Sequence, residues 1–377
     1  MRSTKFLGKV RSELEAPREE RPFGSGWLSG SLALLAGIVG ALMVVVLRYP
    51  SLASVPQLAV VDQSVAFRLA LYFVLVSGFV LAALSLVLRR DKTLGGAAML
   101  VTVFATMFGS LPSHHNVKID GVFFGLDFFI LNVLFTGMLF IPIERLFAQN
   151  KNQHVFRDEW REDLFYYLVS SLFVQVLTYL TLAPSNFVLH NQELSAVRTW
   201  ARELPWVAQL VAIMLLTDIA QYWLHRAFHR VPFLWRFHAV HHSARSMDWI
   251  AGARMHFAEI IVLRSVTATP MLVIGFDESA IQAYMLVVYV YSTFIHSNLR
   301  GSFGILEQIL VVPRFHHWHH GIEKEAVDVN FSIHFPFLDR LFGTHHLPEG
   351  QWPAAYGVAG HPVPKGYWRQ LLYPFRR

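Results

Sequence analysis

The sequence predicts an all-α, polytopic membrane protein with a cytoplasmic helical cap that carries a histidine-rich site for two metal ions. Of the 377 residues, 54% are hydrophobic and only 15% are charged, and the mean hydropathy is positive. A soluble domain rarely carries so apolar a composition. In addition, 14 of the 19 histidines lie between His225 and His346, which predicts the metal site.

The charge and the cysteine content exclude several classes of protein and site. The net charge is +6, and the basic residues mostly flank apolar runs, as expected of residues that set membrane topology and contact lipid headgroups. We therefore expect no nucleic-acid partner. The chain contains no cysteine, which excludes disulfides, thiolate nucleophiles, iron–sulfur clusters and cysteine-ligated zinc. Any metal must be bound by nitrogen and oxygen.

The first 120 residues are expected to hold a cytoplasmic lead-in, residues 1–23, and additional transmembrane helices within residues 24–120. The lead-in has charges of both signs and lacks the pattern of a secretory signal. Trp27–Leu47 and Leu69–Leu88 carry no charge and approach the length of about 20 residues that crosses a bilayer. Gly95–Leu111 is shorter and contains glycine, which makes it a further candidate.

The later part of the chain contains five more apolar runs. These are Val122–Ile143, Leu164–Ala183 before Pro184, a run from Pro205 into Asp218, Ile260–Phe276 and Ala280–Ile295. The last two are separated by a short turn and predict either an out-and-back hairpin or a re-entrant pair. Residues after Gly301 lack a long apolar run and are expected to form short helices and loops of the cap.

Loop charges predict the topology. The lead-in has six Lys and Arg, the 49–63 loop has none, the RRDK sequence at 89–92 is basic, and residues 145–161 carry four more. Because basic loops stay on the cytoplasmic side, this alternation places the N-terminus inside. The histidine-rich segments then share the cytoplasmic face of a bacterial inner membrane or an endoplasmic reticulum.

The first histidine motif is TDIAQYWLHRAFHR. Asp218, Tyr222, His225 and His229 are separated by four, three and four residues, so that all four lie on one stripe of a helix. Imidazoles at positions i and i+4 can bind one metal ion. A lone histidine here would more often be a satisfied polar residue, but further clusters weaken that interpretation.

Two further motifs, RFHAVHHS and RFHHWHHG, both contain H-x-x-H-H. They supply His238, His241 and His242, and then His316, His319 and His320, with His317 inside the second motif. Three imidazoles from one helical turn can reach one or two metal ions. His296, in FIHSN at the end of an apolar run, is another candidate. Nine imidazoles exceed the needs of one ion, which indicates two.

The donor set narrows the chemistry without fixing it. Zinc, copper, nickel and iron all accept imidazole. A zinc protease of the H-E-x-x-H type needs a glutamate after the first histidine, where this chain has Arg226, and Met247 and Met255 lack the spacing of a copper site. A dinuclear site facing lipid favours iron that activates dioxygen, and zinc-dependent hydrolysis is the rival.

These motifs resemble the fatty acid hydroxylase and sterol desaturase superfamily, integral-membrane non-haem diiron enzymes. The three histidine boxes of that superfamily are filled by HRAFH, HAVHH and HHWHH, and DIAQYWLHR, MDWIAGARMH and NFSIHFPFLDRLFGT are similar as well. The resemblance covers residues 121–347, and residues 348–377 are expected to form a C-terminal tail. Residues 1 to about 112 exceed the four-helix membrane core that it implies.

The resemblance also implies roles for individual residues. It makes ligands of nine histidines, which are His225, His229, His238, His241, His242, His296, His316, His319 and His320. His256 lies where relatives often have histidine followed by proline, although Phe257 follows here, and His317 lies between ligand positions. Asp218, Asn298, Asn330 and Asp339 are candidates to hydrogen-bond the ligand imidazoles and fix their tautomers.

The implied activity is hydroxylation or desaturation of a lipid, such as a fatty acyl chain, a sterol or a related lipid, at an unactivated C–H bond. Two iron ions and O2 would supply the oxidation, and purified protein could contain zinc instead. No flavin, dinucleotide or haem motif is evident, so electrons would come from NAD(P)H through a separate reductase or a ferredoxin- or cytochrome-type donor. A zinc-dependent membrane lipid hydrolase remains the alternative. A metal transporter is disfavoured because the histidines lie at helix ends.

Overall fold

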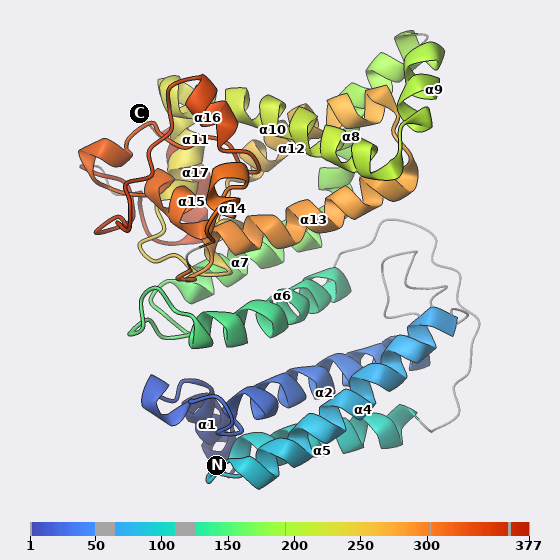
Figure 1. Ribbon diagram of the computed structural model, residues 1–377, viewed down its shortest axis with the longest axis vertical. Coiled ribbons are helices and arrows are strands. Elements are labelled where there is room, and N and C mark those ends of the chain that lie inside the picture. The colour runs from blue at the N-terminus through green and yellow to red at the C-terminus, as the bar shows by residue number, and fades with distance from the viewer. Residues whose placement is uncertain are drawn as a thin grey trace. The chain divides into compact units, whose positions relative to one another are not determined.

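The regular secondary structure in the parts that the structure describes consists of helices joined by loops (Figure 1). The computed structural model describes residues 2–49, 65–109, 126–192, 194–301, 303–360 and 363–376. Over these ranges there is no β-strand, and Gly321 and Tyr356 form an isolated antiparallel bridge. Two compact units form, Met1–Arg157 and Asp158–Arg377. The predicted all-α fold is therefore confirmed.

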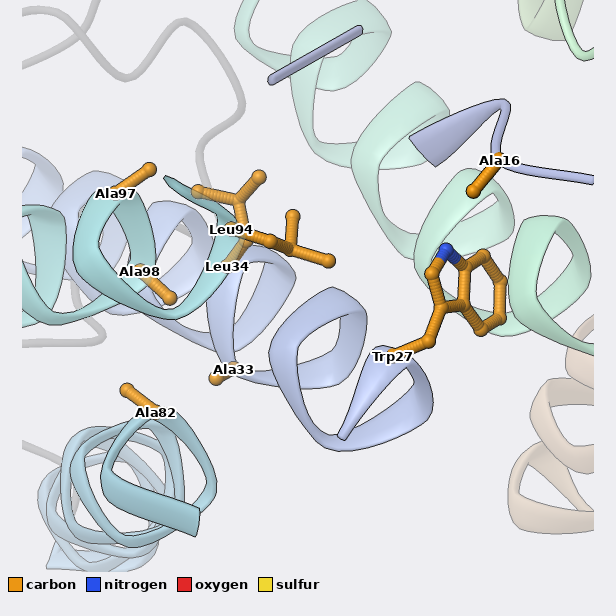
Figure 2. Close-up of a cluster of buried hydrophobic side chains, with 8 residues drawn as sticks. All are labelled: Ala16, Trp27, Ala33, Leu34, Ala82, Leu94, Ala97 and Ala98. Atoms are coloured by element: carbon orange, nitrogen blue, oxygen red, sulfur yellow. The ribbon is translucent and has the colours of Figure 1, made fainter. Parts of the chain in front are cut away.

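The N-terminal unit is built on three apolar helices that pack side by side. Its elements are α1 (Arg2–Leu14), η1 (Arg18–Glu20), α2 (Trp27–Arg48), α4 (Val65–Leu88), α5 (Thr93–Gly109) and α6 (Leu126–Leu146). Helix α2 packs against α4, α5 and α6. Figure 2 shows the core at these contacts, which is made mostly of alanine and leucine with the buried Trp27 indole at one end.

Small residues allow α2 to approach its neighbours closely. A Cβ atom at Gly37 would lie 2.7 Å from Thr102 Oγ1 of α5, and one at Gly30 would lie 2.4 Å from Ser85 Oγ of α4. Helices in lipid associate through such close contacts because apolar burial offers little driving force there. Packing is therefore the role that we assign to these glycines.

Polar contacts fix the lead-in to this bundle. Trp27 Nε1 donates a hydrogen bond to Glu13 O at 2.9 Å. The buried Arg89 forms an ion pair with Glu13 at 2.5 Å, and Arg145 Nη2 donates to Ala16 O at 3.0 Å. The charged lead-in is therefore ordered against the helix ends of its own unit.

The C-terminal unit consists of long apolar helices with a set of short helices at one end. Its elements are α7 (Trp160–Leu172), α8 (Val174–Asn191), α9 (Ser195–Glu203), α10 (Trp206–Arg230), α11 (Pro232–His242), η4 (Ala251–Ala253), α12 (Phe257–Ile274), α13 (Glu278–His296), α14 (Leu306–Ile309), α15 (Pro313–His319), η5 (Lys324–Ala326), α16 (Phe337–Leu341), α17 (Tyr367–Leu372) and η6 (Tyr373–Phe375). Helix α12 packs against α8 and α10, and α13 packs against α10. The short helices α11 and α14 to α17 gather where α10 and α13 end, whereas α9 lies at the other end of the unit (Figure 1).

Among the described residues, four helices are long and apolar enough to cross a membrane, namely α2, α4, α10 and α12, and the bent pair of α7 and α8 would be a fifth span if it crosses as one. These helices fit a multi-pass membrane protein. The runs Trp27–Leu47 and Leu69–Leu88 are confirmed as helices, and the shorter α5 matches the run from Gly95 within the described residues.

One predicted membrane span is not the single straight helix that we expected. The run Leu164–Ala183 was expected to be one helix ending before Pro184, but it is divided between α7 and α8, which are bent by 65°. Pro184 lies inside α8. Proline is tolerated within apolar helices because neighbouring groups satisfy the freed backbone, and a hydropathy run does not reveal a bend.

The C-terminal residues are packed into this unit. Tyr166 OH donates to Gln370 Oε1 at 2.7 Å, His256 Nε2 lies 3.0 Å from Leu371 O, and the rings of Phe237 and Phe375 pack edge to face. The expected tail therefore covers α7 and α11. The domain limits at residues 121 and 347 stay predictions.

Candidate metal centre

Four helices of the C-terminal unit deliver the predicted histidines to one region. Helix α10 carries HRAFH in its last turns, and α11 follows after the single residue Val231. Proline is the first residue of both α11 and α15, a position where its missing N–H costs no helical hydrogen bond. Helix α13 ends at His296. Each box is therefore held on a short, well-started helix or at a helix end.

All nine predicted histidines lie in two clusters. The five-histidine cluster consists of His225, His229, His238, His242 and His319, and the four-histidine cluster consists of His241, His296, His316 and His320. Within each cluster, one ring nitrogen from every member lies within 4.8 Å of the others. Every member is buried except His229, which is partly buried. The structure thus brings together the histidines of the three spaced motifs and His296, the candidate at the end of an apolar run.

Each H-x-x-H-H box divides its histidines between the clusters. In α11, His238 and His242 belong to the five-histidine cluster, whereas His241 belongs to the other. The box of α15 divides in the opposite sense, because His319 joins the five-histidine cluster and the other two join the four-histidine cluster. Adjacent residues therefore point into neighbouring clusters, and the rings of His242 and His320 stack with centroids 4.4 Å apart.

The tautomers of two facing imidazoles indicate that the four-histidine cluster suits a cation. His241 Nδ1 lies 2.9 Å from Arg254 O, and His296 Nδ1 lies 2.6 Å from Ser292 O. A carbonyl only accepts, so each Nδ1 carries the hydrogen and each Nε2 presents a lone pair. These two Nε2 atoms lie 3.3 Å apart. Two lone pairs at that distance repel unless a cation lies between them.

The remaining separations agree with this interpretation. Nε2 of His238 lies 3.0 Å from Nε2 of His225 and 3.1 Å from Nε2 of His242. Nε2 of His316 lies 3.0 Å from Nε2 of His296 and 3.2 Å from Nε2 of His320. Imidazoles bound at about 2.1 Å to one ion place neighbouring nitrogens roughly 3 Å apart. The donor sets therefore fit metal ions.

Burial keeps these imidazoles neutral. It lowers the pKa values of His238, His241 and His242 well below the usual value, and neighbouring imidazoles lower them further. The same causes act on the three histidines of the third box. A neutral imidazole has the lone pair that metal binding requires, so both boxes are ready to bind a metal at neutral pH.

One short segment, residues 328–331, contacts three imidazoles of the five-histidine cluster. Asp328 Oδ1 lies 3.4 Å from Nδ1 of His229. The carbonyl oxygens of Val329 and Phe331 each accept a hydrogen bond of 2.8 Å, from Nδ1 of His319 and of His225 respectively. The segment therefore fixes the orientation of these three rings.

The backbone of this segment is unusual. Asp328 and Asn330 adopt φ values of 60° and 57°, the left-handed region that only Gly, Asn and Asp visit readily. Asn330 Nδ2 donates to Phe315 O at 2.9 Å and to His346 O at 2.7 Å, and Asn330 Oδ1 accepts from His346 N at 2.8 Å. Its side chain thereby clamps the segment.

Asp218 and Asp339 also bond to backbone. Asp218 accepts from the amides of Ile333 and Phe335, each at 2.8 Å, and Asp339 accepts from the amide of Phe331 at 2.7 Å. Both carboxylates thus fix the backbone of residues 331–335, which includes the Phe331 carbonyl that accepts from His225. They were expected to bond to the imidazoles themselves, and they do so only through this backbone. Asn298, the fourth candidate, is buried two residues after His296.

His256 and His317 lie outside both clusters. His256 caps α12, since its Nδ1 accepts from Ala258 N at 3.1 Å. His317 Nε2 donates to Ser297 O at 3.1 Å, and its Nδ1 accepts from Tyr356 OH at 2.9 Å. Burial lowers the pKa of His317 to about 3. Both histidines join chain segments to each other.

The other histidines of the cap are also separate from the clusters. His334 is buried and its ring lies between Tyr284 and Tyr291. The rings of His345 and His346 pack against Phe315 and Trp318. His114 and His115 lie outside the described residues.

Sequence reasoning missed Glu259, which contacts a cluster directly. Its Oε1 lies 2.5 Å from Nδ1 of His238, and both side chains are almost fully buried. Glu259 is the one acidic residue of the apolar helix α12. An ionisable residue in such a helix is a functional hypothesis by default, so this signal was available.

Arg254 was also missed as a support of the site. Its carbonyl accepts from His241, while its buried guanidinium pairs with Asp163 at 2.5 Å and with Glu159 at 3.2 Å. Burial lowers the pKa of Arg254. The carboxylates of Asp163, Glu159 and Glu162 together raise this pKa by more than burial lowers it, so the net shift is upward. These partners are 91 or more residues away, and no spacing rule links them.

The comparisons with known proteins identify the region that holds these clusters. Residues 210–344 match the family model described as fatty acid hydroxylase. The chain is 29% identical over 178 residues to an ornithine lipid hydroxylase (OlsE) of Rhizobium tropici, and the alignment covers 47% of this chain and 54% of that protein. No solved structure matches the chain.

Two other relatives align with a similar share of the chain. An alkylglycerol monooxygenase of Xenopus tropicalis is 30% identical over 163 residues, which is 43% of this chain and 35% of that protein. A methylsterol monooxygenase (1-2) of Arabidopsis thaliana is 25% identical over 140 residues, 37% and 46% of the two chains. The chain thus spans about half or less of these relatives. Residues 210–344 nevertheless hold all nine clustered histidines, so the part of the chain that matches the fatty acid hydroxylase family is the part that carries both clusters.

Proposed function

We propose that this protein is a membrane-bound, metal-dependent oxygenase that hydroxylates or desaturates a lipid at an unactivated C–H bond. The observation that carries the proposal is the convergence of nine imidazoles into two adjacent clusters. The relatives support an oxygenase acting on lipid, since they are named as an ornithine lipid hydroxylase, an alkylglycerol monooxygenase and a methylsterol monooxygenase.

The two clusters would hold two iron ions, and zinc could replace iron in purified protein. When bound, iron supplies the O2 chemistry and the oxidising strength that no side chain has. The chain's own residues fix the geometry. The carbonyls of Val329, Phe331, Arg254 and Ser292 hold Nδ1 hydrogens, so that Nε2 atoms face inward. Electrons would come from a separate reductase or a ferredoxin- or cytochrome-type donor.

The apolar helices of the same unit support a lipid substrate. Helices α10 and α12 are long enough to cross a bilayer, and α10 carries His225 and His229 in its last turns. A lipid chain in the bilayer can therefore approach the clusters along the helix that supplies two of the imidazoles. Burial of the clusters also excludes water from the oxidation.

Comparative lipid analysis tests this proposal. A host that lacks the gene would be complemented with wild type, with His241→Ala, or with His345→Ala as a histidine outside both clusters. We expect wild type and His345→Ala, but not His241→Ala, to produce a lipid that differs by one oxygen or two hydrogens. If the new product is a hydroxylated lipid, growth under 18O2 should label its added oxygen. Identical lipid profiles for wild type and His241→Ala would contradict the oxygenase, and a product that forms without O2 would indicate the zinc hydrolase.

We also propose that the clusters face the cytoplasm. The basic residues that follow apolar runs support this orientation, among them Arg226 and Arg230 at the end of α10. The chain contains no cysteine, so Arg245→Cys introduces a single thiol at an exposed position next to the second box. We expect a membrane-impermeant maleimide to label it only after the cells are opened. Labelling of Arg245→Cys in intact cells would contradict the proposed cytoplasmic orientation of the clusters.

A further inference from the structure

Carboxylates contact two of the imidazoles in the five-histidine cluster. Glu259 Oε1 lies 2.5 Å from Nδ1 of His238, and Asp328 Oδ1 lies 3.4 Å from Nδ1 of His229. Both contacts are to the outer nitrogen of the ring. A metal on Nε2 makes Nδ1 the hydrogen-bearing atom, and each carboxylate then accepts from it.

The imidazoles of the four-histidine cluster have different described partners. Nδ1 of His241 and of His296 donate to the neutral backbone carbonyls of Arg254 and Ser292. Over the described part of the chain, Nδ1 of His316 and of His320 has no hydrogen-bond partner. This cluster also offers one donor fewer.

This difference affects how strongly each cluster binds a metal. A carboxylate that accepts from Nδ1–H shifts electron density toward Nε2 and makes it a stronger ligand, and hydrogen bonds to a charged acceptor are about twice as strong as neutral ones. A buried site screens this effect little. The five-histidine cluster therefore has both the larger donor set and the more basic donors.

We propose that Glu259 and Asp328 are positioning residues that make the two metal sites unequal, so that the ion in the five-histidine cluster is bound more tightly and lost last. This inference rests on the dimetal centre of the proposed function. It goes beyond that centre because it assigns an order of metal binding and the residues that set it.

The two carboxylates differ in strength. The Glu259 side chain is 1% exposed, and its Oε2 atom has no hydrogen-bond partner among the described residues. The Asp328 side chain is 23% exposed. Its Oδ2 lies 3.3 Å from Arg230 Nε, and this positive charge partly neutralises the carboxylate. Glu259 therefore has the larger effect on its imidazole.

Iron binding by the purified full-length protein tests the proposal. The protein would be titrated without O2 against Fe2+ buffered by a chelator, and bound iron would be measured by mass spectrometry. Wild type should bind two equivalents of unequal affinity. His229→Ala should remove the tighter equivalent, and His316→Ala the weaker one, which assigns each equivalent to its cluster.

The carboxylate variants then decide the inference. We expect Glu259→Gln, which keeps the shape of the side chain, to weaken the tighter equivalent by about 10- to 100-fold and to change the weaker one by less than about twofold. Asp328→Asn should act on the same equivalent by a smaller factor. Glu278→Gln is the control, because Glu278 is exposed and lies at the end of α13 opposite His296.

Each outcome bears on the proposal. Titrations of Glu259→Gln that match wild type and Glu278→Gln, or equal weakening of both equivalents, would overturn the inference while leaving the lipid oxygenase standing if the lipid product still forms. Wild type that binds no iron would overturn both. If Glu259→Gln is not monodisperse, Asp328→Asn on its surface loop decides, and an unchanged tighter equivalent there counts against the inference.

Discussion

At the scale of single residues, Gly252 controls the position of a clustered imidazole. A Cβ atom there would lie 2.8 Å from Nδ1 of His296, so Gly252→Ala should push that ring away from its acceptor, Ser292 O, and out of the four-histidine cluster. We expect lipid product to fall at least about tenfold, in line with the loss of one supporting contact. Product yield and bound iron measure this.

The matched control is Gly96→Ala in α5, where a Cβ would meet nothing within 4 Å. Alanine is favoured over glycine inside a helix by about 0.5–1 kcal/mol, so this variant should be as active as wild type and no less stable. Wild-type activity in Gly252→Ala would show that the His296 ring is free to shift.

Arg254 is expected to be the most sensitive charged residue of the C-terminal unit. Arg254→Met removes the partner of the fully buried Asp163, and breaking a buried ion pair from one side costs about 3–5 kcal/mol. Arg254→Lys keeps the charge but loses the planar guanidinium that bonds two acceptors at once. Its free energy of unfolding should lie between those of wild type and Arg254→Met. Denaturant unfolding in detergent measures the order.

The exposed pair between Arg11 and Glu15 gives the comparison, because Arg11 is 59% exposed and such pairs contribute only about 0.2–1 kcal/mol. Equal effects of Arg254→Met and Arg11→Met would contradict a structural role for the buried network.

The residues of the site divide into those that spacing predicts and those that it does not. His225 and His229, or His238 and His242, share a helix face at i and i+4, so their grouping follows from local geometry. Glu259 and Arg254 reach their imidazoles from other helices, and Asp218 and Asp339 bond to backbone rather than to rings. Contacts of that kind depend on tertiary packing. The role of the nine histidines as ligands stays a prediction.

At the scale of elements, segment 328–331 is the part of the cap whose backbone conformation bears most directly on the five-histidine cluster. Asn330→Gly removes the three side-chain hydrogen bonds but keeps a residue suited to positive φ, whereas Asn330→Ala adds a left-handed strain of about 1–2 kcal/mol. We expect unfolding free energies in the order wild type, Asn330→Gly, Asn330→Ala. Both variants should also lose iron from the five-histidine cluster.

Chemical denaturation and iron analysis check that order. If Asn330→Ala were as stable as Asn330→Gly, the left-handed backbone would not survive in the variant, and the carbonyls of Val329 and Phe331 would have turned away from their imidazoles. Iron content then reports directly whether the acceptors remain in place.

Hydropathy predicted the helices of this chain better than their breaks. The runs that became α2 and α4 are continuous and nearly without charge, so length alone identifies them. The bend between α7 and α8 at Phe173 follows no proline or glycine, and the proline that was expected to end the span lies inside α8. Such a bend depends on what the two halves pack against.

At the scale of the whole molecule, metal binding should contribute to the stability of the C-terminal unit. The clusters join α10, α11, α13 and α15, and an ion that binds only the folded state stabilises it by about 2.7 kcal/mol at 100 times its dissociation constant. Removal of metal by a chelator should therefore lower the unfolding temperature, and added Fe2+ should restore it.

The control for this prediction is the double variant His229→Ala with His316→Ala, one member removed from each cluster. Its unfolding temperature should be insensitive to the chelator. A wild-type transition that does not move with metal would contradict a centre that ties these four helices together.

The sequence did not show how its apolar helices associate. The extra N-terminal helices were predicted from their apolar length, whereas the packing of α6 against α2 was not, and the compact units meet at residues 157 and 158. Hydropathy does not say which helices are partners, because lipid-facing and helix-facing residues are equally apolar.

The division of each H-x-x-H-H box between two clusters has a consequence for how such a protein can change. Two pairs of neighbouring residues set the separation of the two clusters, His241 with His242 at the end of α11 and His319 with His320 at the end of α15. That separation is therefore a local property of α11 and α15. For the proposed lipid oxygenase, we therefore expect substitutions on the outer faces of α8, α12 and α13 to change which lipid is accepted without changing the distance between the two histidine clusters.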